Sequence, residues 1–99
     1  MSKVIFSIQY ELNPEKREEY FRTIRELKNL LKADGLENYS VFETKGKQNS
    51  FQEQYTFESM AAFENFDDNT DERINILINK INDLAVEHST KYTTLTEIE

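Results

Sequence analysis

The spacing of apolar residues alternates between two and about 3.6 residues along this chain, and this alternation constrains the fold most. From Val4 to Leu12 an apolar side chain stands at every second position, which predicts a strand with one apolar face. A helical spacing follows, then two strands, a second helical region and a last strand. The sequence therefore predicts the order strand, helix, strand, strand, helix, strand.

Capping residues indicate where these elements begin and end. Asn13, followed by a proline, is a good N-cap for the first helix, and Gly35 is a left-handed C-cap for its end. Ser59 caps a short helix, and Asn69 with Glu72 forms a near capping box for the long helix after it. The expected strands are residues 3–12, 39–45, 50–57 and 91–98. The expected helices are residues 14–33, a short helix that includes residues 60–66, and a long helix that follows the Asn69 cap and carries an apolar stripe from Ile74 to Ala85.

This order is that of the ferredoxin-like α+β fold, βαββαβ. Right-handed crossovers place the helices on one face of a four-stranded antiparallel sheet, with the first and third strands in its centre. Residues 1–99 then form a single domain of ordinary size. We also expect apolar side chains such as Ile5 on the other face, from the first three strands, and these predict a homodimer with its two sheets face to face.

Composition excludes several kinds of site. The 99 residues include no Cys, one His and two Gly, which excludes disulfides, thiol nucleophiles, multi-histidine metal sites within one chain and glycine-rich phosphate loops. We therefore expect no cofactor and no metal. Asp67, Asn69 and Asp71 have the first spacings of an EF-hand loop. Glu72 and Ile78, however, stand where that loop needs Gly and a bidentate Glu.

Charge argues against nucleic acid and membranes as partners. The net charge is −7, and residues 51–99 hold eleven acidic and three basic side chains. Phosphates and anionic lipids attract protein surfaces with an excess of basic residues, not of acidic ones. RNA-recognition motifs share the element order, but their third strand carries basic and glycine residues, whereas residues 51–55 read FQEQY. The apolar run at the N-terminus is too short for a secretory signal, so we expect a cytoplasmic protein.

Two segments resemble a known family. Residues 55–66, YTFESMAAFENF, are similar to the strand-to-helix junction of antibiotic-biosynthesis-monooxygenase-like proteins in the dimeric α/β-barrel superfamily. Residues 4–20, in which Pro-Glu-Lys leads into an amphipathic helix, also resemble theirs. The resemblance implies a homodimeric α/β barrel. Members of the superfamily include cofactor-free quinone-forming oxygenases, haem-degrading enzymes and proteins of unknown role.

The chain departs from the enzymes of that superfamily at the positions they use. Those enzymes commonly carry a Trp at the end of the third strand, and the matching residue here is Phe57. Haem-degrading members use an Asn on the first strand and a His in the second helical region. Residues 7–9 and 69–73 match those stretches and offer neither. The resemblance therefore does not carry haem degradation or oxygenase activity over residue by residue.

Strand residues provide the first candidate site. Glu53 is in phase with the aromatic residues of its strand, so it lies at a strand edge, is paired across an interface, or is a carboxylate in a pocket with a raised pKa. Tyr10, Tyr55 and Phe57 are candidate ligand-binding residues, because pockets for small molecules combine aromatic walls with a few polar groups. Packing of the core and of a dimer interface is the alternative for these rings.

His88 is the last candidate for ligand binding. It is the next residue in phase after the apolar stripe of the long helix. A histidine there could be a general base facing a cavity, or simply a polar residue that suits a helix C-terminus. With Glu53 and Tyr55 it completes the set of acid–base candidates.

Three functions fit these observations. The first is a homodimer that binds a small hydrophobic or aromatic molecule in a pocket between sheet and helices. The second is a cofactor-independent monooxygenase-like enzyme acting on an aromatic or polyketide-like substrate. The third is a non-catalytic structural or regulatory dimer. A cavity near Tyr10, Tyr55 and His88 would separate the first two from the third.

Overall fold

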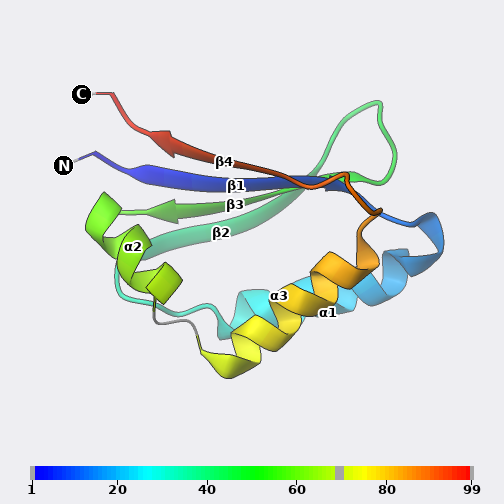
Figure 1. The fold of residues 1–99 in the computed structure, drawn as a ribbon, viewed down its shortest axis with the longest axis horizontal. Helices are drawn as coiled ribbons and strands as arrows, with labels where there is room; N and C mark the ends of the chain where they lie inside the picture. The colour runs from blue at the N-terminus through cyan, green and yellow to red at the C-terminus, as the bar shows by residue number, and fades with distance from the viewer. Residues whose placement is uncertain (1, 69–70, 99) are drawn as a thin grey trace.

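The computed structural model describes residues 2–68 and 71–98, and its element order confirms the predicted βαββαβ arrangement (Figure 1). A short 3-10 turn, η1, precedes the first helix, and the second helical region is divided in two, as the sequence predicted. The elements are β1 (Val4–Glu11), η1 (Pro14–Lys16), α1 (Arg17–Leu30), β2 (Leu36–Glu43), β3 (Ser50–Phe57), α2 (Met60–Asp68), α3 (Glu72–Leu84) and β4 (Lys91–Thr96).

The four strands form one antiparallel sheet in the order β2-β3-β1-β4, so β1 and β3 are central as predicted. Figure 1 shows all three α-helices on the same side of this sheet. None of the helices in residues 2–68 and 71–98 combines the length and the apolar character that a bilayer span requires.

The side-chain period of two sorts the central strands into a helix-facing and an open face. In the β1–β3 register Phe6 lies opposite Tyr55, and Ile8 lies opposite Glu53, all on the helix-facing side. These strands and the helices α1 and α3 supply most of the core, and the alternation predicted for β1 and β3 is confirmed. The buried apolar residues are Val4, Ile8, Tyr10, Leu12, Tyr20, Leu27, Leu31, Tyr39, Phe51, Tyr55, Phe57, Ile74, Leu77, Ile81 and Leu84.

The open face of the sheet is more polar than predicted. Period two assigns all the aromatic residues of β3 to the helix side, so its open-face residues are Gln52, Gln54 and Thr56. The Gln52 amide donates a hydrogen bond to the Ser7 hydroxyl on the neighbouring strand, at 2.8 Å. The expectation that strands two and three would present an apolar or aromatic surface here is wrong for β3. On β2 the exposed Phe42 does lie on this face.

The connection from α1 to β2 differs from the prediction. The helix ends at Leu30, so Gly35 is not its C-cap, although it has the predicted positive φ, +84°. It forms a turn instead, and β2 begins at the next residue, Leu36, rather than at residue 39. A side chain at Gly35 would collide with Ala62 of α2, and the Gly35 carbonyl accepts a hydrogen bond from the Glu58 amide. Glycine is therefore needed here for both conformation and space.

Capping at the remaining helix ends is only partly as expected. The Ser59 hydroxyl caps α2 by accepting from the Ala62 amide at 3.1 Å. Asn13 makes no capping bond; its amide donates to the Leu84 carbonyl at 3.4 Å. For α3 the N-cap is Asp71, which accepts from the Arg73 amide. The capping box and the EF-hand spacing both include Asn69, which lies outside the described residues.

The end of α3 overturns the helical position predicted for His88. The helix stops at Leu84, because Ala85 forms a β-bridge with Leu12 and the Val86 amide donates to the Glu11 carbonyl at 2.7 Å. His88 lies in the turn that follows, with φ +65°. It therefore does not continue the apolar stripe of α3, since backbone pairing to the end of β1 interrupts the helix first.

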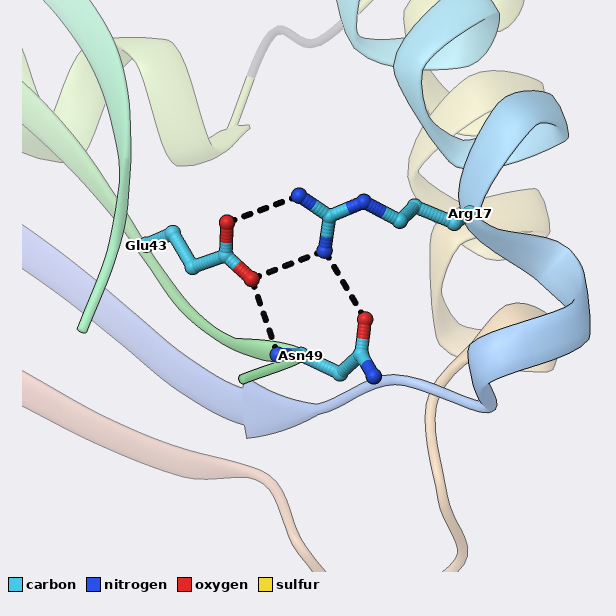
Figure 2. Close-up of polar contacts among 3 residues, drawn as sticks. All are labelled: Arg17, Glu43 and Asn49. Atoms are coloured by element: carbon cyan, nitrogen blue, oxygen red, sulfur yellow. Dashed lines mark hydrogen bonds and ion pairs between the residues drawn. The ribbon is translucent and has the colours of Figure 1, made fainter. Parts of the chain in front are cut away.

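A polar cluster joins the start of α1 to the β2–β3 hairpin (Figure 2). The Arg17 guanidinium donates to both oxygens of Glu43, at 2.7 and 2.8 Å, and to Oδ1 of Asn49 at 2.8 Å. The Asn49 backbone amide, at a residue with φ +65°, donates to Glu43 as well. The guanidinium also lies 4.9 Å from the Phe21 ring centre and 5.5 Å from that of Phe51. We call Arg17, Glu43 and Asn49 the hairpin clamp.

Candidate functional site

A cavity of about 220 Å³ lies between the sheet and α3. Central strands β1 and β3 provide its base, α3 provides one wall, and α2 and β4 contribute one aromatic residue each. Its lining combines four aromatic rings, three isoleucines and three side chains that end in a carboxyl or amide group. The lining residues are Phe6, Ile8, Glu53, Tyr55, Phe66, Asn75, Ile78, Ile81, Asn82 and Tyr92.

Among the described residues of this lining Glu53 is the acidic one, and it is only 2% exposed. Its position on a central strand, in phase with buried aromatic residues, turns the carboxyl group toward the helices. The Tyr39 hydroxyl donates to Oε1 at 2.5 Å, and the Tyr10 hydroxyl donates to Oε2 at 2.8 Å. The Tyr20 hydroxyl lies 2.7 Å from that of Tyr10. We call these four residues the carboxyl–phenol cluster.

Two opposing effects act on the pKa of Glu53. Burial raises it above the ordinary value of 4.5, because the charged form loses its contact with water. The hydrogen bonds from Tyr39 and Tyr10 stabilise the charged form and lower the pKa, but burial is the larger effect. The same burial raises the pKa of Tyr10, Tyr20 and Tyr39, so these phenols are neutral at physiological pH. Of the four residues in this cluster, Glu53 is therefore the one with the lowest pKa and the one best able to exchange a proton.

Aromatic rings surround the apolar part of the cavity. The Phe6 ring stacks on Tyr92 at a centroid distance of 6.1 Å and contacts Tyr55 at 5.9 Å. Tyr55 in turn lies 5.9 Å from Phe66. The Tyr55 hydroxyl makes no hydrogen bond with the described residues, in contrast to those of Tyr10 and Tyr39. It is therefore free to bond with a molecule in the cavity.

Two asparagines of α3 belong to the cavity, and sequence reasoning missed both. Asn75 and Asn82 are seven residues apart, which places them on one side of the helix beside the cavity residues Ile78 and Ile81. Their carboxamides can donate and accept hydrogen bonds. The sequence signal for them is a pair of polar residues beside the apolar stripe of the helix. Ordinary surface helices show the same pattern, so it does not by itself indicate a site.

The structure brings together some of the predicted site residues but not all of them. Glu53 and Tyr55 line the same cavity, and Tyr10 binds Glu53 without being part of the lining. Phe57 is fully buried and is not among the described lining residues, but it packs on Phe66, which is one of them.

His88 lies apart from this cavity. Its side chain is 87% exposed, beside an open surface depression that Tyr10, Lys47 and Lys91 also line. Its Nε2 lies 3.4 Å from Oε1 of the neighbouring Glu87. The structure therefore does not place His88 within reach of Glu53, and its part in binding or catalysis stays a prediction.

The residues around the cavity do not form a metal site of the usual kind. The described part of the chain contains no group of three or more His, Asp or Glu side chains arranged to hold a metal ion. What the lining can do chemically is bind an aromatic body, form hydrogen bonds through Tyr55 and the two asparagines, and hold or release a proton at Glu53.

Comparison by sequence finds no family model and no curated protein that matches the chain. Solved structures, in contrast, match it over nearly the whole length. A conserved protein of unknown function from Bacteroides thetaiotaomicron is 18% identical, with a TM-score of 0.80 over 97% of this chain and 98% of that one. An antibiotic biosynthesis monooxygenase is 20% identical, with a TM-score of 0.77 over all of both chains.

The oxygenases among the similar structures include SnoaB, a cofactor-independent oxygenase from Streptomyces nogalater. It is 15% identical, with a TM-score of 0.72 over 98% of this chain and 94% of that one. At these identities the likeness shows the fold. The predicted resemblance to antibiotic-biosynthesis-monooxygenase-like proteins is therefore confirmed at the level of the fold.

Proposed function

We propose that this chain, with the fold of the antibiotic-biosynthesis-monooxygenase-like proteins, binds a small aromatic or hydrophobic molecule in the cavity between its sheet and α3. The observation that carries the proposal is the lining itself: aromatic and aliphatic walls with a few convergent polar groups, Glu53 among them. This is the usual composition of small-molecule sites. A filled core would leave no such space.

The size of the cavity limits the ligand. A volume of about 220 Å³ lies below the roughly 300 Å³ at which typical ligand pockets begin. The ligand should therefore be small, with one or two rings. The half-exposed Tyr92 ring, 61% accessible, lies at the edge of the site where such a molecule would enter.

Filling the cavity tests the proposal. Ile78→Phe on α3 places a larger ring in the lining, and we expect it to abolish the thermal stabilisation that a panel of small aromatic compounds gives the wild type. Ile76→Phe is the matched control, because Ile76 is 59% exposed on the same helix. Equal stabilisation of both variants, or no stabilisation of the wild type by any compound, would contradict the proposal and favour a structural role.

We infer that the protein works as a homodimer through the open face of the sheet. This face carries no helix among the described residues, and Ile5, Phe42 and Leu95 present apolar surface on it. A chain of this length gains stability by covering such a face. We expect light scattering to give a dimer at micromolar concentration and Ile5→Asp to give a monomer. A monomeric wild type would overturn the inference; Ile76→Asp on α3 is the control.

Glu53 favours a second candidate function, a cofactor-independent oxygenase. A buried carboxylate with a raised pKa can take a proton from an aromatic substrate, as a general base must. The overall reaction would convert a ring methylene and O₂ into a ketone and water. We would measure O₂ uptake with a fused-ring aromatic ketone and no added cofactor. Uptake that Glu53→Gln abolishes and Glu87→Gln keeps would support this candidate, and no uptake above the buffer rate would exclude it for that substrate.

A further inference from the structure

We propose that the cavity selects a ligand that carries a protonated amine on its aromatic or alkyl body, with Glu53 as the counter-ion. This inference rests on the proposed function, because it names the chemical class of ligand for the same cavity. Its basis is the combination of an unpaired buried carboxyl group with a wall of aromatic rings.

Glu53 lacks a positive partner in the part of the chain that the structure describes. The ion pairs there are all formed by other, more exposed carboxylates, such as Glu43 with Arg17 and Glu37 with Lys3. A buried carboxylate without a counter-charge is costly, and phenolic hydrogen bonds compensate only part of that cost. A cation in the cavity would compensate the remaining cost of burying this charge.

The phenols of the carboxyl–phenol cluster offer donors to both oxygens of the Glu53 carboxylate. Tyr39 donates to one carboxyl oxygen and Tyr10 to the other, so the Tyr10 oxygen is left to accept from Tyr20. A charged carboxylate accepts from both phenols at once, whereas in the neutral form one carboxyl oxygen carries a proton of its own. Each carboxylate oxygen retains acceptor capacity for an N–H donor in the cavity.

Aromatic rings in the lining complete a site for a cation. The rings of Phe6, Tyr55, Phe66 and Tyr92 line the same cavity as Glu53. Ammonium groups are attracted to the negative faces of such rings, and more strongly where water is excluded. Glu53 and these rings therefore attract the same charge.

The groups that face Glu53 from each neighbouring element are all neutral. They are Tyr10 of β1, Tyr20 of α1, Tyr39 of β2 and Tyr55 of its own strand, with the amides of Asn75 and Asn82 on α3. None of them can supply the missing positive charge. The net charge of −7 also raises the local concentration of cations.

Binding of an ammonium ion should release a proton. Burial raises the pKa of Glu53, so the empty cavity keeps its carboxyl group protonated to a higher pH than an exposed glutamate would. A cation favours the charged carboxylate and lowers the pKa again. The affinity for the amine should therefore rise with pH through the pKa of Glu53 and become constant once the carboxyl group is ionised.

The test compares 2-phenylethylamine with 2-phenylethanol, two molecules of nearly equal size of which only the first is charged at neutral pH. By calorimetric titration of the wild-type protein we expect the amine to bind at least about tenfold more tightly. In Glu53→Gln the ratio of the amine affinity to the alcohol affinity should fall to about one. Glu87→Gln removes the same charge at an exposed position and should keep the preference.

The outcomes distinguish this inference from the proposed function. If the alcohol binds as tightly as the amine, or if Glu53→Gln keeps the preference, the inference is wrong and the aromatic site stands. If the wild type binds neither probe but other aromatic compounds are bound in the cavity, the inference is again wrong. If nothing binds there, both fail. Proton release by the wild type, measured in buffers of different ionisation enthalpy, needs no variant and so does not depend on how Glu53→Gln folds.

Discussion

Glu43 and Glu53 lie on neighbouring strands, with their side chains on the same face of the sheet, yet their pKa values move in opposite directions. The pKa of Glu43 is lowered to about 2, first by the hydrogen bonds from Arg17 and then by the Asn49 amide (Figure 2). The pKa of Glu53 is raised, because burial outweighs its two phenolic hydrogen bonds. The pKa of a carboxylate thus falls when a guanidinium lies beside it and rises when burial removes its water.

The comparison separates a structural carboxylate from one that is available for function. In the hairpin clamp every Glu43 oxygen is already paired with a charged or backbone donor, which ties the hairpin to α1. In the carboxyl–phenol cluster Glu53 has neutral donors only and lines a cavity. Perturbed groups of the second kind are the ones that bind ligands or transfer protons.

The largest effect should come from removing a donor to Glu53. Tyr39→Phe leaves one oxygen of a buried carboxyl group without its 2.5 Å hydrogen bond, and we expect it to lower the free energy of unfolding by about 2 kcal/mol at pH 7. Urea denaturation measures this change. Tyr92→Phe is the control. Because the Tyr92 side chain is exposed, this variant should lose no more than about 0.5 kcal/mol of unfolding free energy. Equal losses in the two variants would mean that Glu53 does not depend on its phenols.

A second prediction concerns the pH dependence that Glu53 gives to stability. Its pKa is higher in the folded chain than the ordinary 4.5, so the folded state binds more protons above that pH. The contribution of Glu53 is therefore complete below pH 4.5 and declines as the pH rises through the folded pKa. We expect the unfolding free energy of the wild type, relative to Glu53→Gln, to fall over this range. A difference that is constant from pH 4 to 8 would show that the pKa is not raised.

The smallest change in the free energy of unfolding is expected at Glu43, whose contribution to stability changes with pH in the opposite direction to that of Glu53. Its folded pKa of about 2 lies below the ordinary 4.5, so its contribution is present above pH 4.5 and is lost as the pH falls toward 2. Relative to Glu43→Gln, the wild type should lose stability in acid, and the loss should shrink in high salt because the clamp is partly exposed. Acid titrations followed by circular dichroism test this. A salt-independent difference would argue for a buried ion pair instead.

The parts of the fold that could be predicted from sequence are those governed by local periodicity. Alternation in β1 and β3 predicted that Glu53 shares one face with Tyr55, but it left open whether that face is buried under the helices, and the structure shows that it is. The position of His88 could not be predicted in this way. The spacing of apolar residues in the sequence is still helical at His88. The helix nevertheless ends at Leu84, because Ala85 forms a β-bridge with Leu12, a residue distant in the chain.

The sequence by itself determined the order of the elements, the central strands, and which residues of β1 and β3 share a face, because these follow from side-chain periods of two and 3.6 residues and from the right-handed crossover. Only the tertiary structure decided which groups meet Glu53. Tyr39 and Tyr10 are 14 and 43 residues away from it along the chain, and strand pairing brings their hydroxyls to its carboxyl group. A pKa depends on such neighbours and on the exclusion of water, and neither is a property of a residue's local sequence.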